Sequence, residues 1–248
     1  MIKKIMLSLV LFTIFFFSHA INTKAAGWGY KKNPDHIPPD IGHYKSLIDG
    51  TSSFYVGNTT EKVVYLTFDA GYDNGELNKI LDTLKEKQVI GSFFLTGDFI
   101  NRFQDLTCRL SNDGHVVCNH SYGHRKIQNL TKDMLKEDLE KLENAYYKLT
   151  GKNMVKYFRP PEGEFSKEAL KNVQELGYKT VFWSIAHVDW DVNNQPSNEL
   201  TVSSIIDNLH NGAIILLHTV STSNSNSLGE IIDRIKDLGY TFKTVLDL

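Results

Sequence analysis

Residues 63–71, VVYLTFDAG, join an apolar run to a carboxylate and a glycine. The β-branched and aromatic residues of this run favour a buried β-strand, and Gly71 marks the point where the strand gives way to a loop. A carboxylate at such a point lies at the rim where α/β folds place their chemistry. Asp69 is therefore a candidate catalytic residue, although an aspartate there can also serve only to cap a turn or a helix.

Strand-like and helix-like segments alternate from this run to the end of the chain. We predict strands at residues 63–69, 90–96, 115–119, 156–159, 179–186, 213–218 and 240–245. Amphipathic spacing predicts helices at residues 77–87, 99–112, 132–149, 167–176, 201–209 and 228–238. These repeats with short connections imply an α/β fold, a distorted or incomplete (β/α) barrel with about seven parallel strands.

The N-terminus has the features of an export signal. Lys3 and Lys4 precede an apolar run at residues 5–17, and the sequence SHA at residues 18–20 supplies a small-residue cleavage pattern, with residues 24–26 as a second one. The run is short for a membrane span, although an uncleaved anchor is the alternative. We expect a signal peptide at residues 1–26, an ordered arm at residues 27–60, one main domain at residues 61–248, and no stable membrane span after cleavage.

The composition limits the possible partners. The 248 residues carry a formal net charge of -2, which leaves no basic excess to neutralise phosphates, so we expect no nucleic-acid partner. A hydrophobic content of 41% is enough for one sizeable core. We expect the only cysteines, Cys108 and Cys118, to be buried free thiols, although export would permit a disulfide.

Other polar residues lie at or just past the ends of later apolar runs. Because residues that follow parallel strands gather on one face of a barrel, we expect them to meet Asp69 there. They are His120, His124, Arg159, Asp189 and His218.

Each of these residue types suits a different task. Two histidines four positions apart can hold a divalent metal from one face of a helical turn, although surface or capping histidines give the same pattern. Arg159, stiffened by two following prolines, can keep a carboxylate ionised, or it can form a structural ion pair only. Asp189 can orient a histidine, Trp190 can wall a sugar site, and His218 is a candidate general acid.

Five motifs carry a resemblance to a known family. TFDAG, HSYGH, RPPEG, VDW after FWS, and LLH occur in the order and approximate spacing of the carbohydrate-esterase deacetylases that share the NodB homology domain. The resemblance covers about residues 63–248, and five ordered motifs are more specific than any one alone. The N-terminal GWGYKKNPDH and PPD also resemble the subgroup that deacetylates muramic acid and leads to muramic δ-lactam in the spore cortex.

The resemblance implies a role for each residue. Asp69 would be the base that activates water, Arg159 would position that base, and His218 would be the general acid, with Asp189 as its partner. His120 and His124 would hold a divalent metal, which we expect to be zinc. The implied reaction is hydrolysis of an N-acetyl amide, with a backbone N–H just after Pro161 supporting the oxyanion.

Two positions depart from the family pattern. Most members carry a second aspartate directly after the base as the third metal ligand, and this chain has Ala70 there. Either the two histidines hold the metal with water and substrate, or Asp73 substitutes, unless Asp73 caps the helix that begins near Asn74. Glu162 stands where relatives commonly carry tyrosine, so its side chain could shape specificity.

We therefore expect a secreted, monomeric, metal-assisted N-deacetylase that acts on muramic acid in peptidoglycan glycan strands. It would work in the cell wall or, if specific to sporulation, in the intermembrane space of the forespore. Arg125 is a candidate contact for the lactyl carboxylate of muramic acid, beside Glu162 and Trp190. The alternatives are a deacetylase of N-acetylglucosamine in peptidoglycan or chitin, and a catalytically inactive wall-binding relative.

Overall fold

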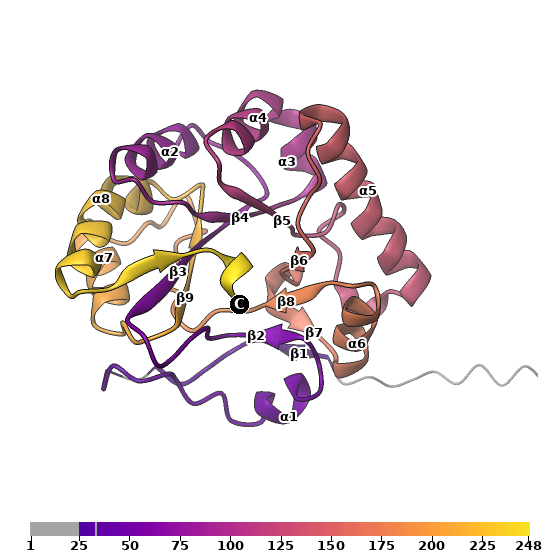
Figure 1. The fold of residues 1–248 in the computed structure, drawn as a ribbon, viewed down its shortest axis with the longest axis horizontal. Coiled ribbons are helices and arrows are strands. Elements are labelled where there is room, and N and C mark those ends of the chain that lie inside the picture. The colour runs from indigo at the N-terminus through magenta and orange to yellow at the C-terminus, as the bar shows by residue number, and fades with distance from the viewer. Residues whose placement is uncertain (1–24, 33) are drawn as a thin grey trace, which may run out of the picture.

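The strands form one curved parallel sheet that closes almost into a barrel. The computed structural model describes residues 25–32 and 34–248, and Figure 1 shows the helices arranged around the strands. The strand order is β10-β3-β4-β5-β6-β8-β2, and β9 pairs with the other edge of β3. This confirms the predicted incomplete (β/α) barrel. The strands are β2 (Ser53–Phe54), β3 (Val63–Ala70), β4 (Ser92–Leu95), β5 (Val116–Asn119), β6 (Tyr157–Phe158), β8 (Lys179–Val181), β9 (Ala213–His218) and β10 (Thr241–Lys243).

Two isolated bridges to β9 complete the ring of strands, and one of them pairs Val56 with Ala213. The chain beyond β8 reaches β9, where Ile185 pairs with Ile215 and the amide of Leu216 donates to the carbonyl of Ile185 at 2.9 Å. The strand predicted at residues 179–186 is therefore too long, because β8 ends at Val181. The amide of Phe182 makes one more bond to the sheet, to the carbonyl of Phe54 on β2 at 2.7 Å, and its ring packs on Trp28 of the N-terminal arm.

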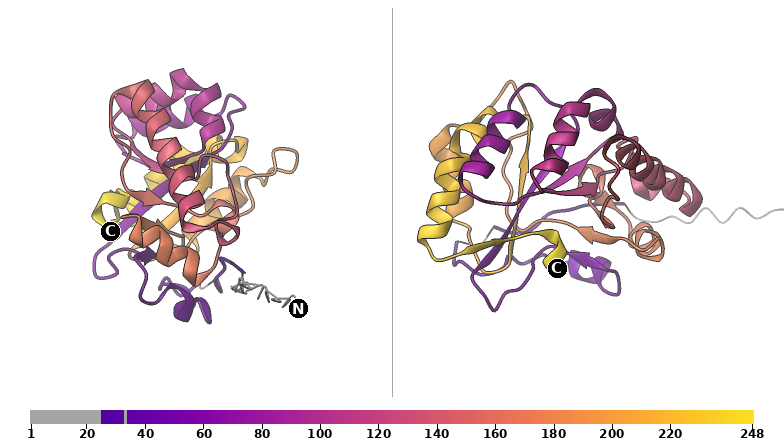
Figure 2. Two further views of the ribbon diagram at one scale, coloured as in Figure 1. Left: turned by 90° about the vertical axis from the view of Figure 1, so that its right-hand side faces the viewer. Right: turned by 45° about the horizontal axis from the view of Figure 1, so that its top comes forward.

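Helices cover the outside of the barrel, as both views in Figure 2 show. The predicted helix at residues 99–112 is two helices, because the backbone of Phe103 has a non-helical φ of -121° and ψ of 55°. Among the described residues, no helix has both the length and the apolar character that crossing a bilayer requires. The helices around the barrel are α2 (Leu77–Glu86), α3 (Gly97–Arg102), α4 (Gln104–Asn112), α5 (Lys132–Thr150), α6 (Lys167–Glu175), α7 (Asn198–Ile206) and α8 (Thr222–Asp237).

The N-terminal arm joins the barrel at two places. β1 (Ala26–Gly27) pairs antiparallel with β7 (Glu164–Phe165), and β2 extends the main sheet beside β8. A short helix, α1 (Tyr44–Ile48), lies between them in the chain. The ring of Trp28 stacks on Phe182 with centroids 4.3 Å apart. The signal peptide predicted at residues 1–26 lies outside the described residues except for its last two.

The amino end of the barrel is covered by the C-terminal segment. A 3-10 turn, η3 (Val245–Asp247), follows β10. The amide of Val245 donates to Ser92 Oγ at 3.1 Å, and Lys179 Nζ donates to the carbonyl of Leu248 at 2.7 Å. Ser92 and Lys179 begin β4 and β8, so η3 lies across the end where the strands start (Figure 1). The carboxyl end of the sheet is left for the candidate site.

The two cysteines are both free thiols. Cys118 is fully buried on β5, and burial raises the pKa of its thiol. Cys108 on α4 is only half-buried, so the expectation of a buried thiol is wrong for this residue.

Candidate active site

Strand register brings the predicted residues together. Asp69 on β3 lies opposite His218 on β9. Asn119 on β5 lies opposite Phe158 on β6, so the residues that follow them, His120 and Arg159, leave the sheet side by side. Neighbouring strands in a sheet are about 4.8 Å apart, which puts side chains at paired positions within contact of one another.

Arg159 is fully buried and fixes one oxygen of Asp69. Its Nη1 donates to Asp69 Oδ1 at 2.7 Å. Its Nε donates to the carbonyl of Val181 at 3.0 Å, and its Nη2 donates to Thr67 Oγ1 at 2.9 Å. The guanidinium carbon also lies 4.1 Å from the centre of the Phe94 ring. These contacts hold the guanidinium plane, and with it the carboxylate, in one orientation.

The environment keeps Asp69 ionised although it is buried. Burial alone would raise the pKa of its carboxyl group, but the charge of Arg159 opposes this, with further contributions from His120 and His218. The net result is a pKa below the usual value of an aspartate. Asp69 can therefore accept a proton at neutral pH.

His120 and His124 face each other although no helix joins them. The segment after β5 is irregular, with φ values of 68° at Ser121 and 48° at His124, so the predicted helical turn is wrong. The ring centroids are nevertheless 5.1 Å apart. His120 Nδ1 donates to the carbonyl of Arg159 at 2.8 Å, which turns Nε2 toward Asp69 Oδ2, 3.5 Å away. Burial lowers the pKa of His120 to about 4, so its ring is neutral and Nε2 has a lone pair available for a metal.

The described part of the chain supplies no third protein ligand beside the two histidines. Ala70 is fully buried in the apolar core between the sheet and the helices. The carboxylate of Asp73 accepts hydrogen bonds from the amides of Gly75 and Leu77 at 3.0 and 3.1 Å, which places it at the entrance to α2. Across residues 25–32 and 34–248, no group of three or more His, Cys, Asp or Glu residues has a geometry that could hold a metal ion. Two imidazoles near a carboxylate are fewer than the three protein ligands usual in a catalytic zinc site.

Asp189 holds His218 through two hydrogen bonds. Its Oδ1 accepts from His218 Nδ1 at 2.7 Å, and its Oδ2 accepts from the His218 amide at 2.8 Å. Burial alone would lower the pKa of His218, but its hydrogen bond to Asp189 and the charge of that carboxylate raise the pKa above the usual value. His218 therefore keeps its proton to a higher pH than an ordinary histidine, as suits a general acid.

One cleft of about 720 Å³ collects most of these groups. Trp190 is 60% exposed on the segment between β8 and α7, which projects from the body in the left view of Figure 2. Arg159 and Asp189 lie behind the lining and hold residues that belong to it, whereas Arg125 is not part of the lining. The predicted residues that line the cleft are Asp69, His120, His124, Glu162, Trp190 and His218.

The turn after β6 has an unusual backbone. Glu162 has a φ of 57° and Gly163 a φ of 65° within the 3-10 turn η2 (Pro161–Gly163). A side chain at Gly163 would put a Cβ atom 2.8 Å from the ring of Trp183, so glycine is required there. Glu162 Oε2 lies 3.1 Å from Lys126 Nζ, which also bonds Glu164 at 2.8 Å. The carboxylate at the rim of the cleft is therefore partly neutralised.

Two residues of the site were not predicted. Asn224 on α8 donates from Nδ2 to Asp189 Oδ2 at 2.6 Å, and so becomes a third donor to that carboxylate. His187 lines the cleft, and neither of its ring nitrogens has a hydrogen-bond partner within the described structure. The polar sequence STSNSNS at residues 221–227, two residues after the LLH motif, was the available signal for Asn224.

Comparison with known proteins shows the family and supports the fold. Residues 56–181 match the family model described as polysaccharide deacetylase. Peptidoglycan-N-acetylmuramic acid deacetylase PdaA of Bacillus subtilis is 44% identical over 232 residues, which cover 93% of this chain and 88% of that protein. A solved structure of Bacillus subtilis PdaA, a family 4 carbohydrate esterase, has a TM-score of 0.87 at 45% identity and covers 91% of this chain and 97% of that chain.

Two more distant relatives bear on the alternatives. A peptidoglycan-N-acetylglucosamine deacetylase from Bacillus cereus is 32% identical over 204 residues, 81% of this chain and 73% of that protein. The solved structure of a CE4 family pseudoenzyme from Bacillus anthracis has a TM-score of 0.73 at 28% identity, with 79% of this chain and 68% of that chain covered.

Proposed function

This chain belongs to the polysaccharide deacetylase family, and we propose that it removes N-acetyl groups from muramic acid in peptidoglycan glycan strands. The observation that carries the reaction is the opposition of Asp69 and His218 on paired strands. Their pKa values are shifted in opposite directions, which gives one group able to accept a proton and one able to donate it. A complete acid and base pair also argues against a purely wall-binding relative.

The chain's own residues account for the proton transfers. Asp69, held through Oδ1 by Arg159, has Oδ2 free to take a proton from the attacking water. His218, oriented by Asp189, gives its proton to the amine as the C–N bond breaks, and acetate is released. A backbone N–H of the turn after Pro161 would support the oxyanion.

We propose that His120 and His124 hold a divalent cation, zinc, in this reaction. Their adjacent rings, of which that of His120 is neutral, fit such an ion, and its remaining positions would be open to water and substrate. When bound, it would polarise the acetyl carbonyl and lower the pKa of the attacking water.

The choice of muramic acid rests on the similarity to PdaA and on the chemistry of the rim. Muramic acid carries a lactyl carboxylate that is free once the stem peptide is gone, so the cleft needs a cation beside it. Lys126 reaches the rim through its ion pair with Glu162. Arg125 does not line the cleft but precedes Lys126 in the chain, and we keep it as a candidate contact. We further propose that the protein acts as an exported monomer and that its product leads to muramic δ-lactam in the spore cortex.

The test is mass spectrometry of peptide-free glycan strands and of chitin oligomers after incubation with the protein, with and without added zinc. We expect loss of acetyl groups from muramic residues, much faster than from chitin, and dependent on metal. Equal rates on both substrates would favour the N-acetylglucosamine alternative, and no release from either would favour the inactive relative. Arg125→Ala should reduce the preference for muramic strands over chitin if that guanidinium binds the lactyl group.

A further inference from the structure

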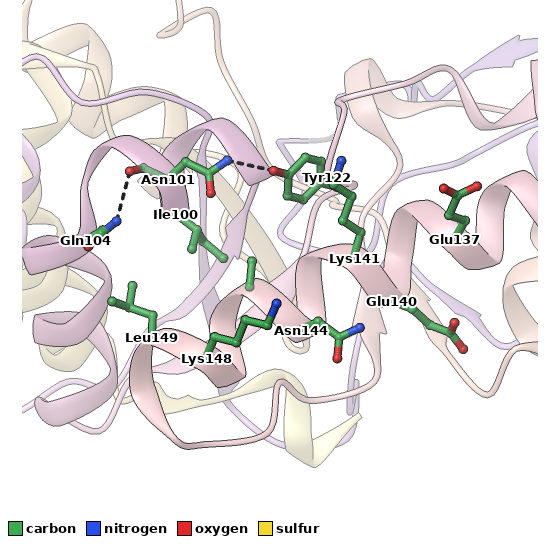
Figure 3. Close-up of a pocket in the computed structure, with 11 residues that line it drawn as sticks. Ile100, Asn101, Gln104, Tyr122, Glu137, Glu140, Lys141, Asn144, Lys148 and Leu149 are labelled. Atoms are coloured by element: carbon green, nitrogen blue, oxygen red, sulfur yellow. Dashed lines mark hydrogen bonds between the residues drawn. The ribbon is translucent and has the colours of Figure 1, made fainter.

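The N-terminal arm contacts residues that line the catalytic cleft. The family model matches residues 56–181, so most of the arm, residues 27–55, lies outside that match. Another groove, of about 730 Å³, lies on the outer wall of the barrel between α5 and the α3–α4 pair. Figure 3 shows Glu137 and Glu140 there on the same helix as Lys141 and Lys148, so its charges favour no ligand of either sign. The arm is the feature outside the family match that reaches the site.

Trp28 of the arm joins two walls of the cleft that are distant in the sequence. Its backbone amide donates to the carbonyl of Gly163 at 2.8 Å, and its indole Nε1 donates to the carbonyl of Trp183 at 2.9 Å. Gly163 and Trp183 both line the cleft. The three residues are closely packed, because a Cβ atom at Gly163 would lie 2.8 Å from the Trp183 ring and 3.1 Å from Trp28 Cβ. One rigid side chain therefore sets the distance between the turn η2 and the segment that follows β8.

Tyr30 of the arm holds the second wall closer to the general acid. The amide of Ile185 donates to the carbonyl of Ile214 on β9 at 3.2 Å, and the next amide, that of Ala186, donates to the Tyr30 hydroxyl at 2.8 Å. The chain is thus held from both sides three residues before Asp189. No other group of the described residues accepts from the Ala186 amide, so without the hydroxyl it would be left unpaired. Burial raises the pKa of Tyr30 to about 12, which keeps the hydroxyl neutral.

The two contacts bear on different steps of the proposed reaction. Trp28 holds the turn whose backbone N–H would support the oxyanion. Tyr30 holds the segment that leads to Asp189, the partner of His218. Groups that take part in a reaction must stay within about 0.5 Å of their productive positions. We propose that Trp28 and Tyr30 are positioning residues, through which the arm fixes the oxyanion turn and the general acid relative to each other, an inference that rests on the proposed function.

Conservative variants test the two contacts separately. Tyr30→Phe and Trp28→Phe keep an aromatic ring and remove one hydrogen bond each. Each should lower kcat on peptide-free glycan strands roughly 3- to 10-fold, as expected for the loss of one hydrogen bond, with little change in KM because neither residue lines the cleft. Tyr178→Phe is the matched control and should keep the wild-type kcat. Tyr178 packs in the same apolar cluster, but its hydroxyl donates to Glu143 on α5.

A double-mutant cycle with Asp189→Asn distinguishes positioning from a general loss of packing. If Tyr30 acts through Asp189, Tyr30→Phe should cause no further loss of kcat in the Asp189→Asn protein, because the two changes share one pathway. Trp28→Phe should keep its full effect there, because it acts on the opposite wall. Additive losses for Tyr30→Phe would overturn its positioning role, and an unchanged kcat in Trp28→Phe would overturn that of Trp28.

An NMR titration of the His218 ring needs no turnover. Tyr30→Phe should lower the pKa of His218 toward its usual value, because a less firmly held Asp189 raises it less. Tyr178→Phe should leave that pKa as in wild type. This shift together with no acetate release from any strand by wild type would count against the proposed function alone. An unchanged pKa of His218 in Tyr30→Phe would overturn the role of Tyr30.

Discussion

The two sides of the cleft differ in how much of their chemistry the chain supplies. On one side, Asp189 accepts three hydrogen bonds, from the ring and amide of His218 and from Asn224. On the other side, His120 is oriented by a carbonyl, but His124 is exposed and the position after the base is Ala70. The proton-donating side is therefore complete, whereas the histidine pair depends on what binds to it.

The two sides differ in the partners that their functions require. Side chains that only move protons can be fixed by hydrogen bonds within the protein, because each partner is another protein group. A cation needs several ligands at once, and one missing carboxylate leaves coordination positions to water and substrate. We therefore expect substitutions on the proton-donating side to lower the reaction rate and substitutions on the histidine side to change the affinity for zinc.

The largest effect is expected on the proton-transfer groups. His218→Ala and Asp69→Asn should each lower acetate release by about 100-fold or more, because a positioned acid or base contributes that much to the rate. Added zinc should not restore either variant. Circular dichroism should show that both remain folded, and near-normal turnover would remove that residue from the mechanism.

The next effect concerns metal affinity on the incomplete side. Ala70→Asp should strengthen zinc binding at least about tenfold, because it adds the carboxylate that the pair lacks. Ala70 is fully buried, so the same variant should be less stable than wild type by about 1–3 kcal/mol when zinc is removed. Isothermal titration and thermal unfolding with and without chelator measure the two effects.

Two controls sharpen this result. His120→Ala/His124→Ala should abolish the zinc binding, and unchanged affinity would move the metal site elsewhere. Asp73→Ala should leave zinc affinity intact, since the carboxylate of Asp73 is occupied by the amides of Gly75 and Leu77.

A smaller effect is expected when the complete side loses its outer support. Asn224→Ala removes one donor to Asp189 and should lower kcat roughly tenfold or less with little change in KM, because the amide orients the carboxylate and does not touch substrate. Asn208→Ala, at the end of α7 and outside the site, is the matched control. An altered KM with unchanged kcat would assign Asn224 to substrate binding instead.

The smallest test needs no variant. The hydrogen bond and the charge of Asp189 raise the pKa of His218 above its usual value, so kcat/KM should fall only as the pH rises through that higher pKa. On the acid side, zinc affinity should weaken as the pH nears 4, because a proton on His120 competes with the metal for its lone pair. A pH profile of kcat/KM checks the alkaline limit and zinc titrations at low pH check the acid one; an alkaline fall at or below pH 6.5 would contradict the role of Asp189.

The barrel and most of the cleft were predictable because both depend on strand ends. Apolar runs that end in polar residues indicated Asp69, Arg159 and His218, and parallel register then brings them together whatever the loops do. The two histidine rings lie together as predicted, but not for the reason that their spacing suggested. Their spacing suggested a helix, but left-handed backbone at Ser121 and His124 brings the rings together instead.

Asn224 was not predicted because its part of helix α8 has no amphipathic spacing. Helix α8 begins at Thr222, capped by the side chain of Ser221, and not at Leu228 as its apolar spacing suggested. Its first turns bury Ser223, Asn224 and Ser225, whose polar groups meet other polar side chains and not the core. A buried polar face gives no amphipathic signal, so a sequence pattern cannot distinguish it from a loop.

The central strand β3 also bears on the order in which the protein can be assembled. One of its edges is shared by β4 and β10, and the other is occupied by β9. Of these partners, only β4 is near it in the chain, so a growing polypeptide carries an apolar strand with unpaired edges until β9 and β10 have been made. Such long-range pairing is slow and exposes the strand to aggregation. This delay would suit the proposed export, because the chain stays unfolded, and able to pass through a channel, until most of it has been made.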